Sequence, residues 1–142
     1  MSEEGKGGIE MWKETIICMI IVIVIIVGNV ITQNYTLESV KELTDELEEL
    51  KEDFLKIEQG EKDNEDAKEK MKEIKENWDT RHNNLAYYIE HDELEKVETD
   101  LTAVNSFIEQ EEYAEAISEL DKSVFILKHI KEKYEFNLQN IF

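Results

Sequence analysis

An uncharged segment from Thr15 to Leu37 constrains this chain more than any other feature. Eight Ile and four Val lie between Ile16 and Ile31. As a helix the segment would be roughly 34 Å long, which exceeds the roughly 30 Å of hydrocarbon in a bilayer. At about −0.3 to −0.6 kcal/mol per residue, the Ile and Val side chains favour insertion by roughly 4 to 7 kcal/mol. The segment predicts a membrane-spanning helix that contacts the lipid bilayer through residues 15–32.

A buried core helix and a cleaved signal peptide are the two alternatives for this segment. A core helix would not need so long an uninterrupted apolar run in a chain this acidic. A signal peptide ends in a small-x-small cleavage site, and Ile-Val-Gly-Asn at 26–29 fits that pattern poorly. We therefore expect an uncleaved anchor over residues 14–35, preceded by a short tail of residues 1–13.

The positive charges beside the anchor indicate its orientation. Lys6, Lys13 and the amino terminus precede the segment, and Lys41 is the first positive charge after it. Because cytoplasmic flanks of membrane helices carry the excess of Lys and Arg, this asymmetry favours a cytoplasmic N-terminus. The expected location is the cell membrane, as a single-pass protein with an extracytoplasmic C-terminal domain. The margin is one or two charges.

The charge and cysteine content limit the possible ligands. With 35 acidic and 16 basic residues, the formal net charge is −19. Nucleic acid is excluded as an expected partner, since its binding requires a basic footprint. One cysteine cannot form an internal disulfide or a thiolate metal cage, and no cofactor is expected.

Apolar stripes with helical spacing follow the anchor. The chain has no proline, and Gly60 is its only glycine after Gly28, so the glycines that hairpin turns favour are scarce. The stripes run through residues 40–57, 67–88, 94–108 and 113–130. The fold class predicted is all-α: a single N-terminal transmembrane helix followed by an antiparallel three- to four-helix bundle. The acidic bundle would occupy residues 36–133, and an apolar tail residues 134–142.

Local signals suggest where these helices begin and end. Thr36 is an expected N-cap of the first helix, and Gly60 is expected to stop it. Asp63 or Asn64 would cap the second helix. A bend is expected near residues 90–92, where Asp92 with a glutamate three residues later resembles a capping box.

The first stripe has the 3,4 spacing of a coiled-coil seam over about three heptads. Homodimerisation through residues 40–57 is one interpretation, with this stretch continuing the anchor as a stalk. The other is packing against Trp78 and Met71 within one chain. The second interpretation is favoured, because short heptad runs are common in monomeric bundles.

Several segments of the sequence, taken together, resemble those of a known protein family. They are the anchor, Trp78, Tyr-Ile-Glu-His-Asp-Glu-Leu at 88–94, Glu-Tyr-Ala-Glu-Ala-Ile at 112–117 and Asn-Leu-Gln-Asn-Ile-Phe at 137–142. Over roughly residues 14–142 the chain resembles a bacterial family of short, membrane-anchored helical proteins catalogued as a domain of unknown function. The resemblance implies one N-terminal anchor and a helical domain, with no known reaction or cofactor. It also suggests a multi-pass membrane protein as a possible partner.

Two places could carry a ligand or a partner. Trp78, His82 and His91 could line a small groove, although a solvated helix face is the commoner explanation for such residues. His91 and Glu95 are four residues apart, as a metal pair would be, but no third ligand is evident and no metal is expected.

The second place is the tail, where large apolar side chains stand at a position that usually frays. These are Tyr134, Phe136, Leu138, Ile141 and Phe142. They would either fold back on the bundle, which is the default, or dock on a partner.

No nucleophile–base pair or closed metal set is visible, so an enzyme is not expected. The function predicted is that of a non-enzymatic single-pass membrane protein whose acidic helical domain is a protein-interaction or scaffold module. The alternative is an extracytoplasmic sensor or binding module for a small ligand or cation.

Overall fold

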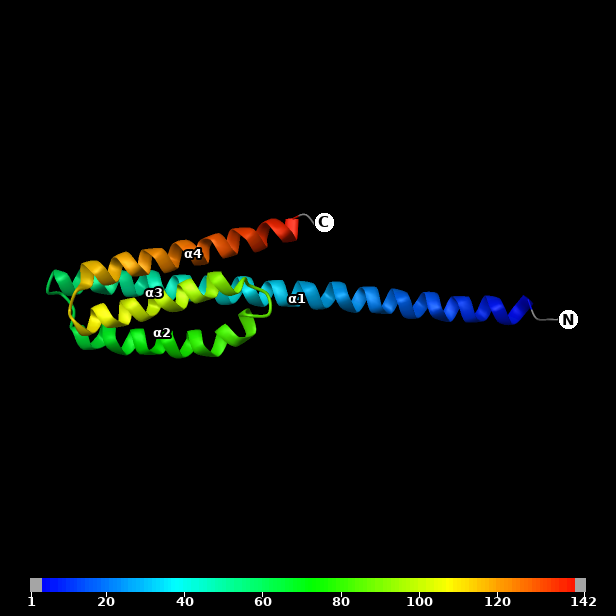
Figure 1. Cartoon of the computed structure of the whole chain (residues 1–142), viewed down its shortest axis with the longest axis horizontal. Coiled ribbons are helices and arrows are strands. Elements are labelled where there is room, and N and C mark those ends of the chain that lie inside the picture. Colours follow the sequence, from blue (N-terminus) through cyan, green and yellow to red (C-terminus); the bar gives the residue numbers. More distant parts are fainter. Residues whose placement is uncertain (1–3, 140–142) are drawn as a thin grey trace. The chain divides into compact units, whose positions relative to one another are not determined.

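The computed structural model describes residues 4–139, with the side chains of residues 11–135. Over that range the chain forms four helices and no strand, which confirms the all-α prediction (Figure 1). The helices are α1 (Glu4–Glu58), α2 (Asn64–Leu85), α3 (His91–Glu109) and α4 (Tyr113–Gln139). The chain divides into two compact units, Met1–Tyr35 and Thr36–Phe142, and α1 contributes residues to both.

The first unit holds the apolar part of α1. Among the described residues, one stretch is long and apolar enough to cross a membrane, Met11–Glu58, and none of its most apolar 18-residue window is buried. Ile and Val side chains from 16 to 27 are about half exposed, although each would favour burial away from water. The chain therefore has, near its N-terminus, one helix able to span a bilayer.

Helix α1 has no break at Thr36, so the prediction that Thr36 caps a new helix is wrong. Thr36 lies inside α1 and is fully buried. Neither glycine nor proline occurs between Gly28 and Gly60, so nothing interrupts the ladder of helical hydrogen bonds. Gly60 does end the helix, because its φ of 74° is a left-handed conformation. Glycine adopts that conformation without strain.

Helix α2 begins at the predicted cap, whereas helix α3 begins before the predicted one. Asp63 is the N-cap of α2, as expected. Its Oδ1 accepts a hydrogen bond from the Glu65 N–H at 3.2 Å. Helix α3 begins at His91, and its N-cap is Glu90, not Asp92. The Glu90 carbonyl accepts the N–H groups of Glu93 and Leu94, so the helix has already begun before Asp92.

The second unit is an antiparallel bundle in which α2 packs on α3 and α3 on α4 (Figure 1). All four helical stripes meet in one core, and the heptad seam of α1 is covered within the chain: Val40, Leu43, Leu47, Leu50 and Phe54 are each at most 3 % exposed. The structure thus follows the interpretation in which this seam packs intramolecularly. Because these side chains are already covered, they offer no exposed apolar surface for a homodimer through residues 40–57.

A buried carboxylate joins α1 to the start of α2. Asp53 is 6 % exposed, and its Oδ2 lies 2.8 Å from Lys62 Nζ and 3.3 Å from Lys70 Nζ. Burial by itself would raise the pKa of Asp53, but the hydrogen bonds and charges of the two lysines outweigh it and hold the pKa below its ordinary value. The carboxylate therefore stays ionised at neutral pH and closes the α1–α2 corner.

Near its C-terminal end, α4 is fastened to the turn between α2 and α3. The Tyr134 hydroxyl donates a hydrogen bond to the Tyr88 carbonyl oxygen, and Lys133 Nζ lies 2.5 Å from Glu90 Oε1. Tyr134 is partly buried against the core. Tyr134, the first residue of the predicted apolar tail, is thus part of α4 and packs against the core.

Removing this hydroxyl tests that contact. Tyr134→Phe should destabilise the bundle by about 0.5 to 1.5 kcal/mol, because the ring stays packed while the Tyr88 carbonyl loses its donor. Thermal denaturation followed by circular dichroism would measure the change. Tyr87→Phe is the matched control, since the Tyr87 side chain is 81 % exposed. Equal melting temperatures for both variants would contradict the contact.

Candidate functional site

Trp78 belongs to the core and offers no surface to a ligand. It is 1 % exposed, and its indole N–H donates a hydrogen bond to a carboxylate oxygen of Glu98 on α3. The His82 ring stands edge-on to it, with ring centroids 5.4 Å apart. One helical turn away, Arg81 pairs with Glu42 of α1. This cluster ties α2 to its two neighbours and gives no support to a ligand groove at Trp78.

His91 is exposed, in contrast to the buried Trp78. It is the exposed first residue of α3, beyond the turn that follows α2. Across the described residues, no group of three or more His, Cys, Asp or Glu side chains is placed to hold a metal ion. Because Trp78 is buried, it does not form one accessible site with His82 and His91, and the ligand-binding alternative stays a prediction.

The remaining predicted site residues are Phe136, Leu138, Ile141 and Phe142. The side chains of all four lie outside the described residues, although the α4 backbone extends to Gln139. Whether these side chains fold back or dock on a partner stays a prediction.

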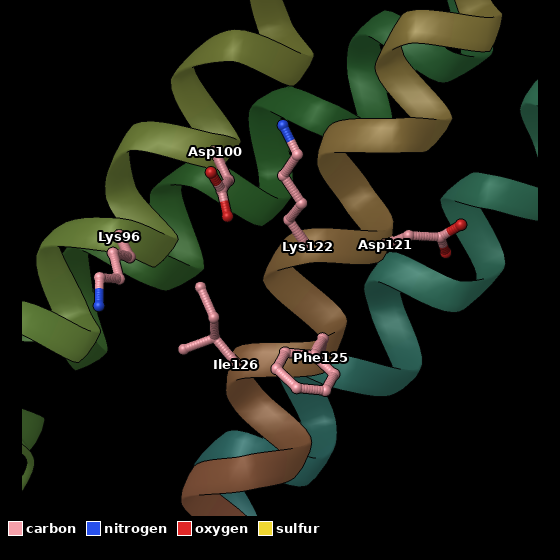
Figure 2. Close-up of a pocket in the computed structure, with 6 residues that line it drawn as sticks. All are labelled: Lys96, Asp100, Asp121, Lys122, Phe125 and Ile126. Carbon is pink, nitrogen blue, oxygen red and sulfur yellow. The ribbon is translucent and has the colours of Figure 1, made fainter.

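An open groove with a volume of about 510 Å³ lies between α3 and α4. We refer to it as the Phe125 groove. Its lining residues are Lys96 and Asp100 from α3, and Asp121, Lys122, Phe125 and Ile126 from α4. Figure 2 shows Asp100 and Lys122 at one side of the groove and Ile126 between the two helices. Asp121 points away toward α1, where Lys51 Nζ lies 2.5 Å from its Oδ1.

Phe125 gives this groove its apolar character. Its side chain is 74 % exposed. Ile126 beside it is partly buried against the core. Sequence reasoning missed both residues, because they lie beside the 3,4 stripe formed by Val124 and Leu127. The sequence does contain a signal for them: Phe125 and Ile126 are apolar residues outside the stripe, and they widen the apolar face of α4.

Asp100 is a carboxyl group of the groove that lies in an environment unfavourable to its negative charge. Its Oδ2 is buried without a hydrogen-bond partner. Burial raises the pKa of this carboxyl above its ordinary value, the nearby Glu119 carboxylate raises it further, and Lys122 acts in the opposite direction. The groove thus carries a carboxylate whose ionised form opposes folding.

This sign leads to a pH-dependent prediction. When folding raises the pKa of a carboxyl group, the protonated group favours the folded state. This contribution to the free energy of unfolding is complete at a pH below the ordinary pKa of the group, and it is lost as the pH rises through the raised pKa. Asp100→Asn should therefore raise the free energy of unfolding at pH 7, by up to about 1 kcal/mol for a partly exposed group. The gain should vanish below about pH 3.9, the ordinary Asp value. Denaturant unfolding at several pH values would measure it.

Asp45→Asn, at an exposed position of α1, is the control for simple loss of a negative charge. An equal gain for both variants at pH 7 would mean that net charge, and not the burial of Asp100, causes the effect.

A comparison with known families identifies the family of this chain. A family model described as "Domain of unknown function (DUF4363)" matches residues 30–141. The chain belongs to this family. The match covers the whole bundle, including Trp78 and the Phe125 groove, and begins after most of the uncharged segment. The expected membership of a family without an assigned function is thereby confirmed.

No curated protein and no solved structure shows significant similarity to the chain. The DUF4363 family description assigns no reaction, ligand or partner.

Proposed function

We propose that this DUF4363 protein is a non-enzymatic, membrane-anchored interaction module. The observation that carries the proposal is the exposed apolar part of α1. Its most apolar window is uncovered by protein, in a chain whose four other apolar stripes are all buried in one core. Such a surface in water would cost several kcal/mol, and a bilayer is the environment that removes that cost.

The proposed orientation places the bundle outside the cytoplasm. Lys6, Lys13 and the amino terminus precede the uncharged segment, while Lys41 is the first positive charge after it. This distribution follows the positive-inside rule with the N-terminus in the cytoplasm. A periplasmically active reporter fused after Phe142 would test the orientation, and an inactive fusion at normal expression would reverse it.

The proposed partner surface is the Phe125 groove. A partner segment with apolar side chains would cover Phe125 and Ile126, while the flanking Lys96 and Lys122 would face its carboxylates. Exposed aromatic residues of this kind supply much of the binding energy where proteins associate. Because the bundle is anchored, a membrane protein beside it is the kind of partner proposed.

Site-specific photocrosslinking in native membranes tests the partner surface. A photoreactive phenylalanine analogue at position 125 should give one discrete adduct, and the adduct should disappear when Ile126→Asp is added. The matched control carries the same analogue at Thr80, an exposed position of α2. Adducts that are identical at both positions, or that persist with Ile126→Asp, would rule out the groove as the binding surface.

A further inference from the structure

Two tyrosines are exposed side by side at the turn between α2 and α3. Tyr87 is 81 % and Tyr88 49 % exposed, and their ring centroids lie 6.2 Å apart. They lie in an uncharged run, 83–89, within a chain in which 36 % of residues are charged. Next to them, Leu85 and Ile89 are buried and hold the turn on the bundle. The tyrosines therefore project from a well-packed base into the surroundings.

Contacts between α1 and α2 place this turn at the Thr36 end of the bundle. Glu46 Oε1 accepts a hydrogen bond from Asn77 Nδ2 at 3.1 Å, and Glu42 pairs with Arg81 one turn further along α2. Arg81 also donates to the Ser39 carbonyl oxygen at 3.3 Å. Each step forward in α2 is thus a step backward in α1. Figure 1 shows α2 ending at the opposite end of the bundle from the α1–α2 turn.

That end of the bundle is the one that the chain enters from the apolar segment. Thr36 follows Ile31, the last apolar residue of the Ile- and Val-rich run, by five residues, and α1 is helical throughout. Five helical residues rise by about 8 Å. The headgroup region of one leaflet is roughly 5 to 8 Å thick. The length of chain between the apolar run and the start of the bundle at Thr36 is therefore about the thickness of one headgroup layer.

From this placement we infer that Tyr87 and Tyr88 form a second contact with the bilayer, in the headgroup region of the leaflet where the anchor emerges. The inference rests on the proposed membrane function. Tyrosine is the residue suited to that layer, because its ring is apolar and its hydroxyl binds water and headgroups. The absence of charge in 83–89 removes the repulsion that the acidic surface would otherwise cause at phosphate groups.

Depth-sensitive fluorescence on the full-length chain tests this contact. In a Cys18→Ala background, Ala86→Cys places a single thiol beside the tyrosines at an exposed position. An environment-sensitive dye on that thiol is measured in phosphatidylcholine vesicles that contain a headgroup-linked nitroxide lipid. Gln59→Cys in the same background is the matched control, at the exposed α1–α2 turn. Its position is about 35 Å further along the axis of α1 than Thr36.

The dye at position 86 should shift its emission to the blue and be quenched by the nitroxide lipid, whereas the dye at 59 should show neither effect. Adding Tyr87→Ser and Tyr88→Ser should abolish the quenching at 86. Because both side chains are exposed, the melting curve of that variant should match that of its parent.

A dye on the native Cys18 separates the two possible failures. If the Cys18 dye is shielded from aqueous quenchers while the dye at 86 behaves like that at 59, the tyrosine contact is overturned and the anchor stands. The exposed tyrosines would then be left for a protein partner. If the Cys18 dye is itself open to aqueous quenchers, the membrane function fails and this contact fails with it.

Discussion

Arginine at both Ile20 and Val24 is expected to release the full-length protein from membranes. Each arginine near the centre of a spanning helix costs about 2.5 to 3.5 kcal/mol, and each replaced residue also loses its own favourable term of roughly 0.3 to 0.6 kcal/mol. The combined cost of roughly 6 to 8 kcal/mol matches or exceeds the total by which the Ile and Val residues favour insertion. Alkaline extraction of isolated membranes, followed by immunoblotting, would show the protein in the soluble fraction.

The matched control is Ile20→Leu with Val24→Leu, which changes the same positions and keeps them apolar. It should stay in the membrane pellet. Because neither substitution touches the bundle, the released arginine variant should still melt cooperatively. Retention of the arginine variant in the pellet, with a folded bundle, would contradict a spanning role for this segment.

Truncation of Trp78 is expected to be the most destabilising single change in the bundle. Trp78→Ala should lower the free energy of unfolding by about 3 to 5 kcal/mol, because it empties a fully packed site and removes the donor to Glu98. A loss of that size corresponds to a fall in melting temperature of at least about 12 °C for a unit of this size. Calorimetry of the detergent-solubilised protein would measure it.

Phe125→Ala is the control, since it also removes an aromatic ring but from a position that is 74 % exposed. Its cost should be below about 0.5 kcal/mol. Comparable losses for the two variants would mean that Trp78 is not the core residue described above, or that Phe125 is covered in solution.

The pattern of the sequence determined the elements and their buried faces. The 3,4 spacing of Val40, Leu43 and Leu47 predicts a buried face because residues three and four apart lie on one side of a helix. Asp63 and Gly60 were recognisable as a cap and a stop, because the physics of those positions is local. The apolar segment was recognisable for a similar reason: its length and lack of charge are properties of composition alone.

Tertiary structure decided what no local pattern contains. The continuity of α1 through Thr36 and the start of α3 at His91 show that a potential cap is used only where the surrounding chain leaves the helix at that residue. The burial of Trp78 against Glu98, and the exposure of Phe125 and Tyr87, depend on which helix stands opposite each side chain. Spacing along one helix specifies a face, but the partner of that face is set by packing between residues distant in sequence.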